Sequence, residues 1–123
     1  MVKILLVSKR QEAIKGFIDA LHAVDEVDLD VTASATDVLD QVRRQPPSLV
    51  IVDYHLEDMA PLDLAMELLK INALVNIAVV STMNEDDFHE ATEGLGLLPR
   101  IPSPPAAMDV TPLLGRLREV LGT

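Results

Sequence analysis

The stretch Leu49-Val50-Ile51-Val52-Asp53-Tyr54-His55-Leu56 decides the fold, because a run of four apolar residues ends in a single carboxylate. The run is rich in β-branched residues and is bounded by Pro46-Pro47 before it and by Glu57-Asp58 after it. This pattern is typical of a strand buried on both faces. Because ligands and chemistry collect outside the carboxyl ends of such strands in open α/β sheets, Asp53 is the first candidate site residue.

The composition indicates one globular domain over residues 1–123, with 49% hydrophobic and 24% charged residues. The chain has no cysteine, which excludes disulfides, zinc–thiolate sites and cysteine nucleophiles. No apolar run approaches the roughly 18 residues of a membrane span. The polar start before the first apolar run is too short for a signal peptide, so we expect a cytoplasmic protein without membrane contact.

The net charge is −10, from twenty acidic and ten basic residues. Such a charge repels phosphate backbones, and we therefore expect no nucleic-acid binding by this domain. An acidic surface of this kind keeps a protein soluble.

Apolar runs and helical periodicities alternate five times along the chain. The predicted strands are 4–7, 29–33, the run from Leu49, 76–81 and one within 97–103. The last of these is expected at a sheet edge because it contains prolines. The predicted helices are 11–23, one capped by Thr36, 62–71, 86–93 after the cap Asn84, and one opened by Thr111-Pro112. With right-handed crossovers this gives a flavodoxin-like (βα)5 doubly wound parallel sheet of five strands in the order 2-1-3-4-5.

The segment from Asp53 to Leu64 resembles the phospho-accepting segment of the receiver domains of response regulators in two-component signalling. The resemblance covers essentially the whole chain. It implies that Asp53 is the phosphoacceptor position and that the backbone carbonyl of His55 would be a ligand of Mg²⁺. It also implies that Ser81, at the end of the fourth strand, contacts the phosphoryl group; the alternative is that Ser81 only caps that strand.

The chain departs from this family at several functional positions. Ser8 and Lys9 stand where the family has an acidic pair that holds Mg²⁺. Ser103 and Pro104 stand where it has a lysine followed by a cis-proline, and we expect Pro104 to be cis by the same match. Arg100 replaces the family's aromatic switch residue, so the usual aromatic relay should be absent.

These departures leave Asp53 as the only carboxylate ligand for a metal. Since Mg²⁺ normally needs one or two carboxylates among several oxygen ligands, we expect Mg²⁺ binding, and with it phosphorylation, to be lost or weak. Lys9 allows two interpretations: an ion pair with Asp53 that replaces the metal, or a side chain that points to solvent.

The sequence therefore predicts an atypical receiver domain, not an enzyme, that acts through protein–protein contacts. The resemblance implies a histidine kinase, a phosphotransfer protein or an output domain as partner, and a possible homodimer through residues 84–121, where Arg100, Arg116 and Arg118 are candidates. The alternative is a working phospho-receiver in which Asp53 accepts a phosphoryl group from a histidine kinase. A flavin or nucleotide binder is disfavoured because no phosphate-binding loop follows the first strand.

Overall fold

Five parallel strands form a single sheet, and the computed structural model describes them within residues 1–122. The strands are β1 (Val2–Val7), β2 (Val27–Thr32), β3 (Leu49–Val52), β4 (Ile77–Ser81) and β5 (Ile101–Pro102). Their order in the sheet is β2-β1-β3-β4-β5. The flavodoxin-like (βα)5 architecture and the strand order predicted from the sequence are confirmed.

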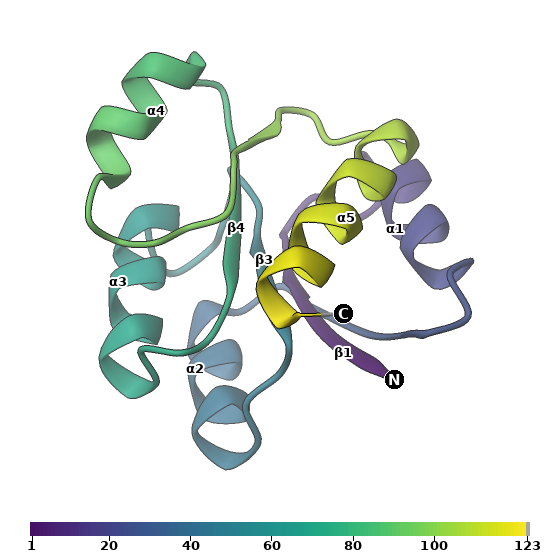
Figure 1. Cartoon of the computed structure of the whole chain (residues 1–123), viewed down its shortest axis with the longest axis horizontal. Coiled ribbons are helices and arrows are strands. Elements are labelled where there is room, and N and C mark those ends of the chain that lie inside the picture. The colour runs from purple at the N-terminus through teal and green to yellow at the C-terminus, as the bar shows by residue number, and fades with distance from the viewer. Residues whose placement is uncertain (123) are drawn as a thin grey trace.

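Helices cover both faces of this sheet, as Figure 1 shows. They are α1 (Lys15–His22), α2 (Ala35–Arg44), α3 (Pro61–Ile71), α4 (Glu85–Thr92) and α5 (Val110–Leu121), with a short 3₁₀ helix, η1 (Ala107–Asp109), directly before α5. Helices α2, α3 and α4 lie on one side of the sheet, and α1 and α5 on the other.

The strands in the middle of the sheet are apolar on both faces because helices bury both. Within β1, Leu6 packs on the side of α1 and α5, whereas Leu5 packs on the side of α2 and α3. All four residues of β3 are fully buried. The apolar run Leu49–Val52 is therefore a strand buried on both faces, as the sequence predicts.

Helices α1 and α2 do not begin where the sequence predicts. Regular helix in α1 begins at Lys15 instead of Gln11, because the amides of Ala13 and Ile14 close turns onto the carbonyl oxygen of Arg10. In α2 the N-cap is Ser34, whose Oγ accepts a hydrogen bond from the Asp37 amide at 3.2 Å. Thr36, the predicted cap, lies inside the first turn.

Three further boundaries concern the C-terminal half. Asn84 caps α4 as predicted, and its Oδ1 accepts from the Asp87 amide at 2.8 Å. Helix α5 begins one residue before the predicted Thr111, because η1 leads directly into it. Strand β5 is only two residues long and lies at the sheet edge, where Pro102, which lacks an N–H, is tolerated.

Among residues 1–122, no helix is both long enough and apolar enough to cross a membrane.

Candidate functional site

The carboxyl ends of β1 and β3 lie side by side and place two polar side chains together. Val7 pairs with Val52 in the parallel ladder, and the next residues, Ser8 and Asp53, leave the sheet at the same level. The Asp53 amide donates to the carbonyl oxygen of Val7 at 3.0 Å. Both Ser8 and Asp53 are fully buried.

Asp53 is held by four hydrogen bonds, two of them from one arginine. Arg10 donates from Nε to Oδ2 and from Nη2 to Oδ1, both at 2.8 Å, which is the two-pronged geometry of a guanidinium on a carboxylate. Ser8 Oγ donates to Oδ2 at 2.6 Å, and the Tyr54 amide donates to Oδ1 at 2.7 Å. Each carboxylate oxygen therefore accepts two hydrogen bonds.

Arg10 also reaches the loop after β5. Its Nη2 donates to Ser103 Oγ at 2.9 Å, and the Arg10 amide donates to Ser8 Oγ at 3.1 Å. The side chain of Arg10 is 22% exposed, whereas that of Asp53 is not exposed at all. The site thus combines groups from the β1–α1, β3–α3 and β5–α5 loops around one buried ion pair.

The electrostatics of the pair keep Asp53 ionised. Burial raises the pKa of Asp53, but the hydrogen bonds from Arg10, Ser8 and the Tyr54 amide, together with the charge of Arg10, outweigh burial and lower the pKa below its usual value. The pKa of Arg10 is raised by its hydrogen bond to Asp53.

The predicted ion pair between Lys9 and Asp53 is wrong, and the solvent-facing interpretation of Lys9 is the correct one. The side chain of Lys9 is exposed, and its backbone amide donates to the carbonyl oxygen of His55 at 3.3 Å. The neighbouring Arg10 takes the place proposed for Lys9. Since a guanidinium offers two parallel donors and an ammonium does not, Arg10 matches a carboxylate better. The feature of the sequence that could have identified Arg10 is that two cations, not one, follow Ser8 in Ser8-Lys9-Arg10.

The donor set around Asp53 does not suit a divalent cation. Mg²⁺ needs free oxygen ligands in near-octahedral geometry, but both oxygens of Asp53 already accept hydrogen bonds, and a guanidinium cation lies against them. The carbonyl oxygen of His55, the second predicted ligand, accepts the Lys9 amide. Residues 1–122 hold no cluster of three or more His, Asp or Glu side chains in metal-binding geometry.

Ser103 and Ser81, two further predicted positions, lie at the ends of β5 and β4. Ser103 belongs to the Asp53 site through Arg10, and the peptide bond between Ser103 and Pro104 is cis, as expected. Ser81 is buried at the end of β4, where its Oγ accepts from the Met83 amide at 3.1 Å. This bond matches the strand-capping alternative for Ser81.

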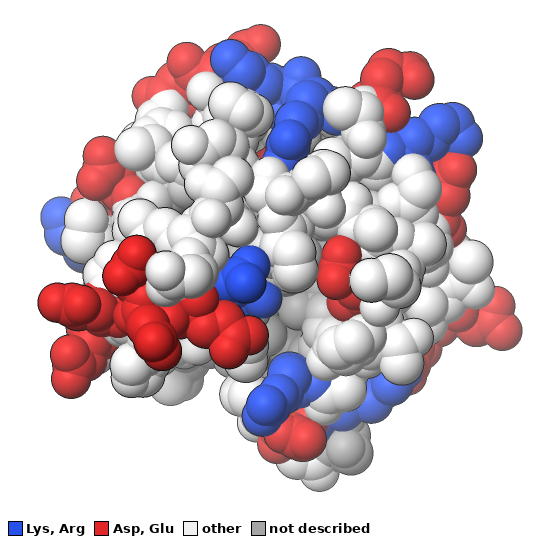
Figure 2. All heavy atoms as spheres, turned by 90° about the horizontal axis from the view of Figure 1, so that it is seen from above, with Lys and Arg blue, Asp and Glu red and all other residues white. Residues whose placement is uncertain are grey.

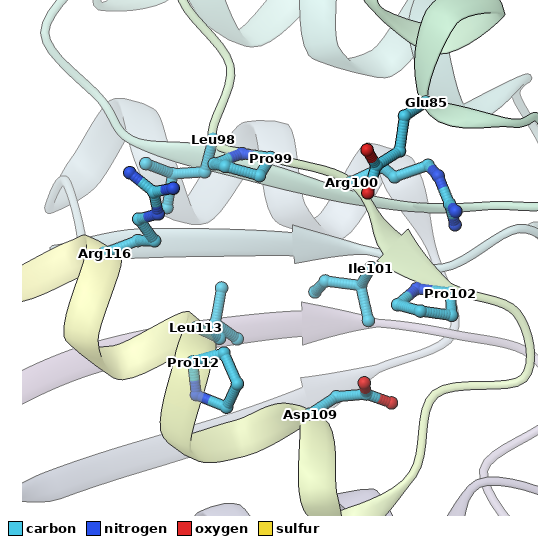
Figure 3. A pocket seen from close by; sticks show the side chains of 10 residues that line it. All are labelled: Glu85, Leu98, Pro99, Arg100, Ile101, Pro102, Asp109, Pro112, Leu113 and Arg116. Atoms are coloured by element: carbon cyan, nitrogen blue, oxygen red, sulfur yellow. The ribbon is translucent and has the colours of Figure 1, made fainter.

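Arg100 lies away from Asp53, in a groove of about 320 Å³ beside β5 and α5. Figure 3 shows Arg100 and Glu85 on one side of this groove and Arg116 of α5 on another, with the apolar side chains of Ile101 and Leu113 between them. Arg100 Nε is buried without a hydrogen-bond partner in the described part of the chain. Seen from above in Figure 2, acidic side chains gather on the same surface; the first turn of α4 contributes Glu85, Asp86 and Asp87.

The fold is that of response-regulator receiver domains. The receiver domain of the Francisella response regulator 1452 superposes with a TM-score of 0.82 at 12% identity, over 97% of this chain and 98% of that chain. A CheY-like response regulator receiver domain protein from Methanospirillum hungatei JF-1 gives 0.82 at 17% identity, over 99% and 98%. The non-phosphorylated HemR receiver domain from Leptospira biflexa gives 0.77 at 20% identity, over 100% and 96%. No protein-family model and no curated protein sequence matches this chain.

Proposed function

We propose that this chain is a signalling receiver domain of the response-regulator type that acts through protein–protein contacts without normal Mg²⁺-dependent phosphorylation. The observation that carries this proposal is the two-pronged ion pair between Arg10 and the fully buried Asp53. The shared fold and the position of Asp53 at the end of the central strand support the signalling role. No enzymatic activity is part of the proposal.

The ion pair opposes phosphorylation in two ways. A carboxylate nucleophile needs a free oxygen that faces the phosphoryl donor, and a metal ion normally neutralises the transferring group. In this chain Arg10 already neutralises Asp53 and covers both of its oxygens. Withdrawal of Arg10 would leave a buried, unpaired charge, which costs about 3–5 kcal/mol in typical buried pairs.

The working surface in this proposal is formed by residues 84–121, which comprise α4, β5 and α5. It contains the groove between Arg100 and Arg116, and Arg116 lies 3.7 Å from Glu119 in an exposed ion pair that contributes little. Arg118 pairs instead with Glu26, outside this surface. A second copy of the chain, a kinase, a phosphotransfer protein or an output domain is the kind of partner that we propose for it.

The test is an intact-mass measurement after incubation with Mg²⁺ and acetyl phosphate, paired with titration calorimetry of Mg²⁺ alone. We expect no added phosphoryl group and no Mg²⁺ binding. A matched variant in which Ser8→Asp, Lys9→Asp, Arg10→Ala and Ser103→Lys restore the family pattern is the positive control, and it should bind Mg²⁺. An adduct on the natural chain that disappears in Asp53→Asn would instead establish the alternative, a working phospho-receiver.

A further inference from the structure

The guanidinium group of Arg10 joins three loops at the carboxyl edge of the sheet, since it belongs to one of them and contacts side chains from the other two. It belongs to the loop after β1 and donates to Asp53 after β3 and to Ser103 after β5. Through Nη2 alone it joins Asp53 Oδ1 at 2.8 Å to Ser103 Oγ at 2.9 Å. We call Arg10, Asp53 and Ser103 the arginine clasp.

The base of the clasp is rigid because it is buried. Asp53 and Ser8 have no exposed surface, and Ser8 Oγ both donates to Asp53 Oδ2 and accepts from the Arg10 amide. The backbone and the guanidinium of Arg10 are therefore both fixed relative to β1 and β3. Ser103 is the least constrained member of the clasp, since it is only half-buried.

The segment that Ser103 begins has little support from the sheet. Strand β5 pairs with β4 at only two positions, and one of these is Pro102, which has no amide to donate. Beyond Ser103, the hydrogen bonds of the backbone amides within the described loop are local: the Asp109 amide donates to the Ala106 carbonyl oxygen, and the Ala106 amide donates to the Asp109 side chain. The segment also packs on α1 through η1, and the Arg10–Ser103 hydrogen bond is the side-chain bond that ties it to the Asp53 site.

We propose that Arg10 is a positioning residue that couples the buried Asp53 site to the β5–α5 segment and so holds the 84–121 surface in one conformation. In this proposal the connection is a permanent link and not a switch, because two hydrogen bonds tie Arg10 to the fully buried Asp53. This inference rests on the proposed function in one respect: it takes residues 84–121 as the working surface.

Hydrogen–deuterium exchange of peptides covering residues 99–109 tests the clasp. Ser103→Ala removes only the outer bond and leaves the Arg10–Asp53 pair in place, so the chain stays folded. Exchange in this segment should become about two- to tenfold faster, the ratio that corresponds to one ordinary hydrogen bond. Ser48→Ala is the matched control, since Ser48 Oγ takes part in no hydrogen bond within the described residues, and it should leave the segment unchanged.

A second variant tests the role of Arg10 itself. Arg10→Ala combined with Asp53→Asn removes the clasp without leaving an unpaired buried charge, and it should accelerate exchange in 99–109 as Ser103→Ala does. Adding Ser103→Ala to it should give no further acceleration, because the partner of Ser103 is already gone. Lys9→Ala, on the same loop but exposed, is the control and should exchange as the natural chain does.

Two results separate this inference from the proposed function. Exchange equal to that of the natural chain in both Ser103→Ala and the double variant would overturn the positioning role, even when acetyl phosphate adds no phosphoryl group. An adduct on Asp53 would overturn the proposed function, whatever the exchange rates are.

Discussion

Asp53 remains charged although its side chain is fully buried, because Arg10, Ser8 and the Tyr54 amide all donate hydrogen bonds to it. Burial alone raises its pKa, whereas the hydrogen bonds of Arg10 and Ser8 lower it. The balance favours the ion because both carboxylate oxygens are fully paired. The same pairing makes the carboxylate a structural group rather than a free nucleophile in our proposal.

The stability of the domain should depend on this carboxylate at low pH. The pKa of Asp53 in the folded state is lowered, so its stabilising contribution is complete above the unfolded value of about 3.9 and is lost as the pH falls through the folded value. We expect the free energy of unfolding of the natural chain to fall more steeply below about pH 4 than that of Arg10→Gln with Asp53→Asn. Urea unfolding at several pH values measures both curves, and parallel curves would contradict this.

At the scale of residues, the sequence predicted where the site lies but not the ion pair between Arg10 and Asp53. Asp53, Ser8 and Ser103 were all identified by position, and the structure brings them together. Arg10 was missed because the choice between Lys9 and Arg10 depends on where a turn directs each side chain. The turn closed by Ala13 onto the Arg10 carbonyl is a product of the folded loop and has no signature in residue spacing.

At the scale of elements, the start of α2 is held by two groups from different parts of the chain. Ser34 Oγ accepts from the Asp37 amide, and Asp58 in the β3–α3 loop accepts from the amides of Ala35 at 3.0 Å and Thr36 at 3.2 Å. The hydrogen bond from the Ala35 amide, with those from Thr36, lowers the pKa of Asp58. Asp58 therefore joins the β3–α3 loop to the start of α2.

Substitution of the cap should identify which hydroxyl matters. We expect Ser34→Ala to reduce the free energy of unfolding by about 1 kcal/mol, the usual effect of losing an N-cap. Thr36→Ala should cost less, because Thr36 Oγ1 makes one exposed bond to Asp58 and caps no amide. Urea denaturation of the two variants measures the difference, and the reverse order would show that Thr36 is the cap after all.

The order of the elements was predictable and their ends were less so. Continuous apolar runs identify β1, β3 and β4 because both faces of these strands are covered, whereas β2 alternates, with exposed Asp28 and Asp30 on either side of buried Leu29. Helix ends depend on competition between adjacent cap residues, and Ser34 and Thr36 are chemically equivalent candidates. The prolines of the segment 97–103 predicted that the fifth strand lies at a sheet edge, and the strand there is only two residues long.

At the scale of the whole molecule, one sheet separates two apolar layers that must fold together. Leu5 and Leu6 are neighbours in β1, yet they belong to different layers. Because β1, β3 and β4 each contribute to both layers, disruption of one layer weakens the strands on which the other depends. The domain is therefore expected to unfold as one cooperative unit.

Alanine substitutions on the two faces test this cooperativity. Leu5→Ala and Leu6→Ala should each cost about 2–5 kcal/mol, the range for truncation of a buried leucine, and each variant should unfold in a single transition. Leu74→Ala is the control, since Leu74 is 89% exposed, and its effect should stay within about 0.5 kcal/mol. Fluorescence is of little use with three aromatic residues, so circular dichroism and calorimetry are the measurements; two separated transitions would contradict a single unit.

The Arg10–Asp53 pair also has a consequence for the evolution of the chain. Loss of Arg10 alone leaves a buried carboxylate without its partner, and loss of Asp53 alone leaves a cation without its partner. Each single substitution towards a different set of site residues therefore gives a less stable protein. New acids at positions 8 and 9 would have to arrive together with the departure of Arg10 and the arrival of a cation at position 103. Few series of single substitutions make these changes together, so we expect the present arrangement of the site to change slowly. Arg10 therefore makes the present arrangement of the site difficult to change by single substitutions.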